Sequence, residues 1–169
     1  MQKRFFLSAV ALGLLAAHAG TALAQEKFKI GLILPMTGPF ASTGKQIEAA
    51  ARLYIAQNGD TVGGKKVELI VKDDTSAPDV TKRIAQELVV NDKVNVLAGF
   101  GLTPLALATA PLATQSKTPM VVMAAATSSI TQASPYVVRT SFTLPQAAVA
   151  MADWAPNNGI KKVVTLVSD

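Results

Sequence analysis

The sequence predicts an α/β fold, a doubly wound parallel sheet, and three observations support this prediction. Short apolar runs typical of buried strands alternate along the chain with stretches whose apolar residues recur at helical spacing. Half of the 169 residues are hydrophobic, which is enough to fill a sizeable core. Glycine, proline and hydroxyl residues gather after three of the apolar runs, where open α/β sheets place their ligands.

The first residues predict a secretory signal peptide. Lys3 and Arg4 precede an apolar run over residues 5–17, and Ala22-Leu23-Ala24 has the small-x-small pattern of a cleavage site. We expect cleavage after Ala24, so residues 1–24 would be removed and the mature protein would be periplasmic. A membrane anchor is the alternative, but the apolar run is shorter than the roughly 20 residues that a span needs.

Composition excludes several kinds of chemistry. The chain has no cysteine, and its single histidine, His18, lies in the expected signal peptide. The mature chain would therefore lack disulfides, thiolate chemistry and any Ser-His or Cys-His pair. We expect no enzyme activity, no metal and no cofactor. Loss of Lys3 and Arg4 lowers the net charge from +5 to +3, and the other basic residues are interleaved with acids, so we expect no nucleic-acid partner.

The first half of the mature chain reads as strand, helix, strand, helix. A strand is expected over 29–34 and a helix over 43–58, with Thr43 and Gln46 at capping-box spacing. The buried face of this helix is expected to carry Ile47, Ala50, Ala51, Tyr54 and Ile55. A turn at 62–64 precedes a strand over 67–72. The next helix begins within 76–79 and buries Val80, Ile84 and Leu88.

The second half continues the alternation. A strand is expected over 94–100, followed by a helix that starts after Thr103-Pro104 and is kinked at Pro111. Further strands are expected over 120–124, 136–142 and 162–167, with a helix over 147–154 between the last two. The chain ends directly after the last expected strand, without the helix that normally covers it. We therefore expect the second part of the fold to be truncated.

Three loops follow parallel strands and carry small or hydroxyl residues: 35–44, 99–104 and 124–129. Free amides, hydroxyls and helix amino-termini at such a place suit an anionic group. Two structural alternatives stay open. Thr103 could cap the helix that Pro104 begins, and Thr127, Ser128 and Ser129 could start a short helix that ends at Ala133.

The amino-acid sequences of these segments resemble those of a known protein family. The segment 31–74, which begins GLILPMTGPFASTG, is similar to the opening of periplasmic solute-binding proteins of the leucine/isoleucine/valine type, which serve ABC importers. The segments 94–131 and 134–169 resemble the next two landmarks of that family. The resemblance implies a type I periplasmic-binding-protein fold, with 25–143 as the first ligand-binding lobe. Residues 144–169 would begin a second lobe, and the rest of that lobe would be missing.

The resemblance also implies a site. Carried over by position, Thr103 binds the carboxylate of the ligand beside Leu102 and Leu105, while Ala125, Ala126 and Thr127 present backbone groups and a hydroxyl. Phe40 is a further candidate because it could line the pocket, as could Phe100. Amino-acid binders often carry several serines where this chain has Leu102-Thr103-Pro104. An aromatic or other small carboxylic acid therefore competes with a branched-chain amino acid as the ligand.

The partner implied by the family is an ABC permease in the inner membrane. One alternative is a ligand-sensing domain of the same fold that controls a receptor or kinase. Another is a secreted enzyme that uses Asp73, Asp74 and a lysine. No catalytic constellation can be assembled for that enzyme without histidine or cysteine.

Overall fold

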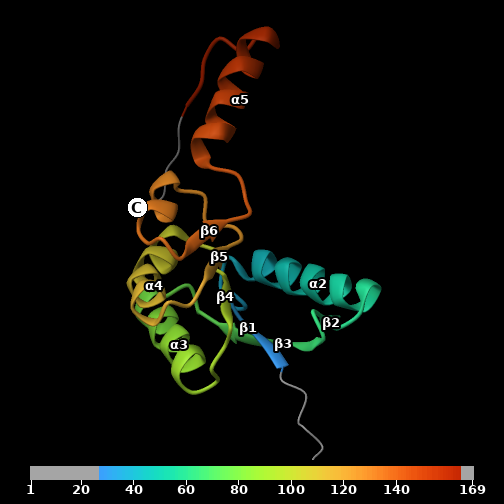
Figure 1. Ribbon diagram of the computed structural model, residues 1–169. Helices are drawn as coiled ribbons and strands as arrows, with labels where there is room; N and C mark the ends of the chain where they lie inside the picture. Colours follow the sequence, from blue (N-terminus) through green and yellow to red (C-terminus); the bar gives the residue numbers. More distant parts are fainter. Residues whose placement is uncertain (1–26, 165–169) are drawn as a thin grey trace, which may run out of the picture.

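The computed structural model describes residues 27–164, which form one mostly parallel sheet with helices on both faces (Figure 1). Six strands lie in the order β2-β3-β1-β4-β5-β6, and only β2 runs antiparallel to its neighbour. The strands are β1 Lys27–Leu34, β2 Thr61–Val62, β3 Lys65–Asp73, β4 Val96–Gly99, β5 Met120–Val122 and β6 Val137–Arg139. The predicted fold class, a parallel α/β sheet, is confirmed.

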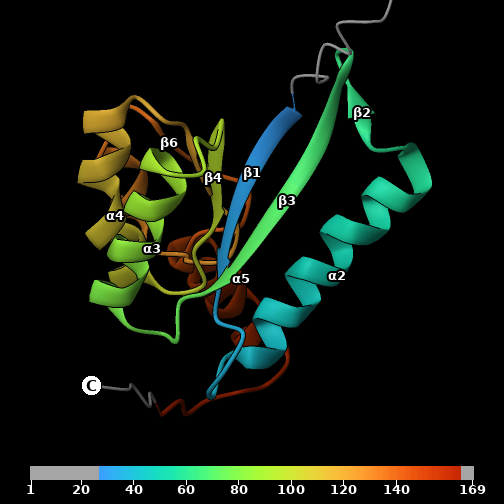
Figure 2. The same cartoon turned by 90° about the horizontal axis from the view of Figure 1, so that it is seen from below.

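The helices divide between the two faces of the sheet. Helices α3 and α4 pack side by side on one face, whereas α2 alone covers the other (Figure 2). Helix α5 follows β6 and projects away from the sheet (Figure 1). The bounds are α2 Ala41–Asn58, α3 Pro78–Val90, α4 Thr103–Ser116 and α5 Leu144–Asn157, with a 3-10 helix η1 at Ser128–Gln132.

The strand order has a switch point between β1 and β4. The chain winds from β1 outward to β3 on one side, and then returns to β4, β5 and β6 on the other. Ligands of open α/β sheets bind beyond the carboxyl ends of the strands at such a point. The loops after β1, β4 and β5, singled out from the sequence, therefore lie on three adjacent strands at one edge.

The core lies mainly between the sheet and helices α3 and α4. Ile84 and Leu88 of α3 are buried there beside Ile33 and Leu97 of the sheet, which confirms the predicted face of α3. The α2 side buries Leu32, Leu34 and Ala98, with Ile47 and Ala51 only partly covered. Helix α2 therefore covers its face of the sheet incompletely.

The predicted buried face of α2 is correspondingly only half right. Ile47, Ala51 and Ile55 are half-buried, but Ala50 is exposed and Tyr54 has 67% of its surface exposed. Both residues line grooves on this incompletely covered face, Ala50 opposite Met123 and Tyr54 opposite Leu69.

Two glycines hold the elements around the switch point in close contact. A Cβ at Gly99, which has φ of +113°, would lie 2.0 Å from the carbonyl oxygen of Ile33. A Cβ at Gly44 would lie 2.2 Å from the carbonyl oxygen of Pro35. Because both contacts are with backbone, neither position can accept a larger residue without moving β4 or the first turn of α2.

The amino-termini of the helices differ from the expected ones. Helix α2 begins at Ala41, with Phe40 as its N-cap and no side-chain cap, so the predicted capping box of Thr43 and Gln46 is wrong. A turn from Gly38 to Ala41 starts the helix earlier, and the Gln46 side chain donates to Ser42 Oγ instead. A complete capping box is found at α5, where the Thr143 hydroxyl accepts from the amide of Gln146.

The ends of the expected strands also differ. The expected turn at 62–64 is confirmed, and Gly63 and Gly64, both with positive φ, join β2 to β3. The strand expected over 162–167 is absent from its described part, since residues 161–164 pair with no strand. The rest of that strand and the expected signal peptide lie outside the described residues. Within residues 27–164, no helix is long and apolar enough to cross a membrane.

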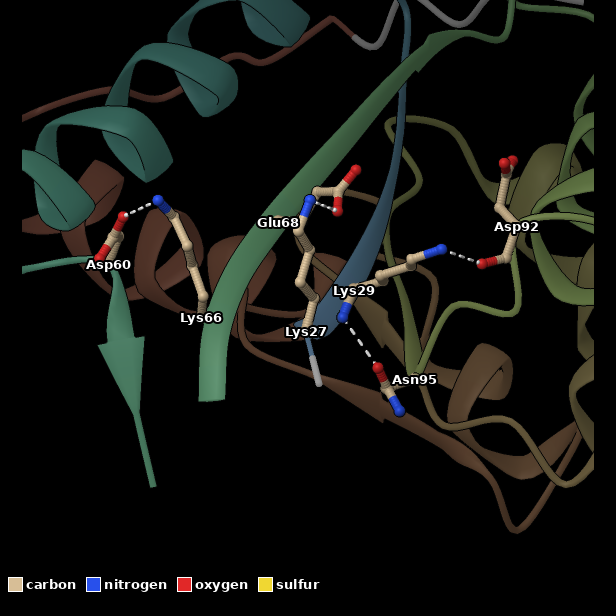
Figure 3. A network of polar contacts seen from close by, with 7 residues as sticks. All are labelled: Lys27, Lys29, Asp60, Lys66, Glu68, Asp92 and Asn95. Carbon is tan, nitrogen blue, oxygen red and sulfur yellow. Dashed lines mark hydrogen bonds and ion pairs between the residues drawn. The ribbon is translucent and has the colours of Figure 1, made fainter. Parts of the chain in front are cut away.

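Polar contacts tie together the strand ends opposite the switch-point loops (Figure 3). Lys27 pairs with Glu68 at 3.1 Å, and Lys66 pairs with Asp60 at 3.1 Å. The Lys29 amide donates to Asn95 Oδ1, and its ammonium donates to the carbonyl of Asp92. The ion pair with Lys66 is exposed, and hydrogen bonds from Lys66 and Thr61 lower the pKa of Asp60. Such surface pairs account for several of the interleaved charges.

Candidate functional site

Two threonine hydroxyls meet at the carboxyl edge of the sheet. Thr103 follows β4 and begins α4, and Thr127 follows β5 and precedes η1. Their hydroxyl oxygens lie 2.7 Å apart, and either can be the donor. Because a hydroxyl has one proton and two lone pairs, one of the two protons is left over for another acceptor.

Neither hydroxyl caps a helix. The N-cap of α4 is Leu102 and that of η1 is Thr127, and neither helix has a side-chain cap hydrogen bond. The two structural alternatives fare differently. The cap role considered for Thr103 is wrong, whereas Thr127 does stand immediately before a short helix, but with its hydroxyl turned to Thr103. Neither hydroxyl is therefore used to cap the helix beside it.

The amino-terminus of α4 adds positive electrostatic potential at this point. The amide of Ala106 donates to the carbonyl of Leu102, which closes the first turn. The first amides of a helix, here Thr103 and Leu105, have no intrahelical acceptor, and Pro104 has no amide to satisfy. Together with the helix dipole they favour an anion beside Thr103.

The other residues expected at the site occupy different environments. Leu102 is half-buried beside the pair, whereas Leu105 is only 1% exposed and packs inside the lobe. Phe40 ends the β1–α2 loop with 45% of its surface exposed, and Phe100 is fully buried in the core. Phe100 is therefore core rather than pocket lining.

The alanines before Thr127 are held by backbone hydrogen bonds. The Ala125 amide donates to the carbonyl of Phe100 at 3.0 Å, and the Ala126 carbonyl accepts from the amide of Leu144 at 2.9 Å. Ala125 is buried and Ala126 is half-buried. The loop that carries Thr127 is thus attached both to the end of β4 and to the first residue of α5.

Asp73 braces the loop after β1. Its Oδ1 accepts from the amides of Met36 and Thr75, both at 2.9 Å, and its Oδ2 accepts from the Thr37 hydroxyl at 2.6 Å. Burial tends to raise the pKa of Asp73, but these hydrogen bonds outweigh it and lower the pKa. The carboxylate of Asp73, on β3, thus holds the loop after β1 in place. From the sequence alone, only its position at the end of a strand pointed to this role.

Asp74 is fully buried in the same turn. Its Oδ1 accepts from the amide of Ser76 at 2.8 Å, while its Oδ2 has no hydrogen-bond partner. Burial, and secondarily repulsion from Asp73, raises its pKa. Among residues 27–164, no group of three or more His, Cys, Asp or Glu could hold a metal ion. Asp73 and Asp74 therefore accept hydrogen bonds from the backbone amides of the turn that follows β3.

Arg139 is the residue that the sequence reasoning missed. It ends β6, and its Nη1 donates to the carbonyl oxygen of Thr127 at 2.7 Å. The feature that identifies Arg139 is its position at the end of β6, next to β5 in the sheet. Arg139 pairs in register with Val122, the last residue of β5, so its side chain emerges beside the loop that holds Thr127.

Thr103 and Thr127 are both half-buried. A groove of about 460 Å³ lies nearby, between Thr43, Gln46, Ile47 and Ala50 of α2 and the residues Met123, Ala124, Ser141 and Phe142. It shares Ala124 with the loop after β5 but includes neither threonine.

The sheet order and the switch point define an open, doubly wound α/β sheet. A model of the periplasmic binding protein family matches residues 27–169. The chain therefore belongs to the periplasmic binding protein family.

Similar proteins agree with this assignment. The Leu/Ile/Val-binding protein homolog 6 of Brucella abortus is 47% identical over 99% of this chain and 42% of its own length. The chain thus spans about two fifths of the length of this curated relative. The resemblance to leucine-type solute-binding proteins is confirmed.

Solved structures are also similar. An ABC-transporter solute-binding protein of Rhodopseudomonas palustris BisB5, solved with 3,4-dihydroxybenzoic acid, is 67% identical with a TM-score of 0.78. The match covers 80% of this chain and 37% of that one. A second R. palustris solute-binding protein, solved with 4-hydroxybenzoate, is 45% identical with a TM-score of 0.77, over 79% of this chain and 37% of that one.

Proposed function

We propose that this chain forms one wall of the ligand site in the extracytoplasmic solute-binding component of an ABC importer. Its ligand is a small carboxylic acid, and it has no catalytic activity of its own. The observation that carries the proposal is the Thr103–Thr127 hydroxyl pair at the amino-terminus of α4. In the family the site passes its ligand to a permease in the inner membrane, which is the proposed partner.

The hydroxyl pair binds the carboxylate by exchanging partners. Without ligand, one hydroxyl donates to the other at 2.7 Å. When a carboxylate arrives, both hydroxyls rotate and donate to it, and the free amides of the first turn of α4 contribute further donors. The carboxylate has only acceptors, so it satisfies every donor without leaving one unpaired.

The ligand class proposed first is a hydroxylated benzoate. Two solved proteins with 67% and 45% identity carry such acids, and Leu102 and the exposed Phe40 supply apolar surface near the edge. A branched-chain amino acid is the second candidate, supported by the name of the Brucella relative. Both ligands have the carboxylate that the threonines require.

The division of the chain follows the same proposal. Residues 25–143 form the first lobe, and 144–169 begin the second, which is supported by the projection of α5 away from the sheet (Figure 1). Exposed apolar residues on α5, among them Val149, Met151 and Trp154, suit a helix that packs against further structure. Hinge closure between the two lobes would trap the ligand.

The proposal places the mature protein in the periplasm, after cleavage between Ala24 and Gln25. The charged start, the apolar run and Ala22-Leu23-Ala24 support this. Intact-mass measurement on the periplasmic fraction should give a chain that begins at Gln25. A product that keeps residues 1–24 and stays with the membrane would contradict it.

The binding proposal is tested with a graft, in which the aligned part of this chain replaces its counterpart in the R. palustris BisB5 protein. Calorimetry should detect 3,4-dihydroxybenzoate, and weaker or no binding of leucine. The corresponding benzamide is the matched neutral ligand and should bind much more weakly. A folded graft that prefers leucine would overturn the aromatic assignment, and one that binds neither acid would overturn the proposed function.

A further inference from the structure

We infer that Arg139 is a positioning and specificity-determining residue of the carboxylate site. It fixes Thr127 through the carbonyl oxygen, and it places a positive charge behind the hydroxyl pair that favours acids over neutral analogues. This inference rests on the proposed function, but it concerns a residue on β6 that lies outside the binding loops.

The first step is geometric. Thr127 has φ of −68° and ψ of 129°, and its side chain makes no cap hydrogen bond that would hold this conformation. Its carbonyl accepts from Arg139 Nη1 at 2.7 Å and from the amide of Ile130 at 3.3 Å. The bond from Arg139 is the shorter of the two and is charge-assisted, so it contributes most to the orientation of this residue. The hydroxyl oxygen that meets Thr103 belongs to the same residue.

The second step concerns charge. Arg52 pairs with Glu48, and Arg83 pairs with Glu87, but Arg139 pairs with no acid among the described residues. It is half-buried, and among the described residues it donates one hydrogen bond, to the Thr127 carbonyl, although a guanidinium carries five N–H donors. A partly desolvated cation without an anionic partner in the described part of the chain makes the potential at the neighbouring loop positive.

The third step is the attachment of the loop. The Thr127 carbonyl is bound by Arg139, and the preceding Ala126 carbonyl is bound by the amide of Leu144. Two successive carbonyls of the binding loop are thus held by the segment that leads from β6 into α5. The hydroxyl pair therefore takes its position from this segment as well as from α4.

The test compares an acid with its amide in the graft. Arg139→Met removes the charge and the hydrogen bond, and Arg139→Lys keeps the charge but loses the planar guanidinium. We expect Arg139→Met to weaken 3,4-dihydroxybenzoate about tenfold or more and to weaken 3,4-dihydroxybenzamide much less. Arg139→Lys should weaken both ligands and retain most of the preference for the acid. Arg83→Met, on α3, is the matched control and should leave both affinities unchanged.

The outcomes separate the inference from the proposed function. If Arg139→Met lowers the affinities for the acid and the amide equally, Arg139 has only a structural role. If both affinities are unchanged, Arg139 has no role in binding. Either result overturns the inference while the proposed function stands. If Arg139→Met does not fold, Arg139→Lys decides, because loss of the preference for the acid in that variant contradicts the inference. An unsubstituted graft that binds neither compound overturns the proposed function first.

Discussion

The hydroxyl oxygens of Thr103 and Thr127 lie 2.7 Å apart although the residues are 24 positions apart in the chain. Their contact is a consequence of the sheet. Strands β4 and β5 pair in parallel, with Gly99 opposite Val122, so the loops that follow them leave the same edge side by side. If these hydroxyls bind the ligand as proposed, their mutual hydrogen bond orders both before it arrives and lowers the entropic cost of binding.

Removal of either hydroxyl should weaken carboxylate binding. Thr103→Val and Thr127→Val keep the shape of the side chain, and each should raise the dissociation constant of the graft for 3,4-dihydroxybenzoate about tenfold. Because each hydroxyl orients the other, the double variant should lose less than the sum of the two single losses. Calorimetry on the three variants measures this coupling.

Thr61→Val is the control for these variants. Thr61 lies on β2, an edge strand remote from β4 and β5 in the sheet order, and it is exposed. Its affinity should equal that of the unsubstituted graft. If Thr103→Val and Thr127→Val also bind normally, neither threonine contacts the ligand.

Asp73→Ala should loosen the loop after β1. The substitution leaves the Met36 and Thr75 amides and the Thr37 hydroxyl without their acceptor. We expect a loss of about 1–3 kcal/mol in the free energy of unfolding, measured by urea denaturation. Because the pKa of Asp73 is lowered by folding, its contribution is present above the unfolded pKa and is lost as the pH falls through the folded one.

The difference between Asp73→Ala and the unsubstituted chain should therefore be larger at pH 7 than at pH 3. Asp153→Ala is the control, since Asp153 is an exposed residue of α5. Equal stability of Asp73→Ala and Asp153→Ala at neutral pH would show that the loop does not need the brace.

Asp74→Asn should stabilise the protein at neutral pH. Burial raises the pKa of Asp74, so its favourable contribution is complete below the unfolded pKa and is lost as the pH rises through the folded one. A neutral amide keeps an acceptor for the Ser76 amide and removes the buried charge. The thermal midpoint should rise by about 2–4 °C at pH 7, which corresponds to roughly 1 kcal/mol, and by less at pH 3. A lower midpoint at pH 7 would mean that the carboxylate has a partner in solution.

Thr143→Ala should destabilise the start of α5. The Thr143 hydroxyl accepts from the Gln146 amide, and the Gln146 side chain accepts from the Thr143 amide at 2.7 Å. Loss of an N-cap costs about 1 kcal/mol, so amide exchange in the first turn of α5 should be several times faster. Thr131→Ala is the control, and the amides of α3 should be protected equally in both variants.

Much of the fold could be predicted from the sequence because it depends on local patterns. Apolar runs such as 29–34 and the helical spacing of Val80, Ile84 and Leu88 are read directly, and parallel pairing follows from the alternation of strands and helices. The first residues of the helices are predicted less accurately. The first turn of α2 depends on the turn at Gly38, whereas the spacing of Thr43 and Gln46 suggested a later start.

The site could be predicted only in part, for a similar reason. Thr103 and Thr127 directly follow strands, where a hydroxyl residue indicates a possible ligand contact. The neighbouring sequence does not show that the two hydroxyls bond each other rather than cap helices. The Arg139 contact with Thr127 depends on which strand lies next to β5 and in which register. A pair of residues on different strands becomes visible only when the sheet order is known. The burial of Leu105 likewise depends on how α4 packs.

The last prediction concerns the 169-residue chain by itself. The proposed site has only one wall in this chain, whereas a pocket normally buries 70–90% of a small ligand. On the proposed function, the described residues would supply the carboxylate contacts but no second wall for the ring of a benzoate. We therefore expect this chain to bind 3,4-dihydroxybenzoate at least a hundredfold more weakly than the graft does, since the loss of about 3 kcal/mol of apolar burial corresponds to such a factor. Titration followed by NMR should still move the amide signals of Thr103, Leu105 and Thr127, and the Thr103→Val variant should reduce these shifts. Micromolar binding by the chain alone would show that one lobe encloses the ligand without a second wall.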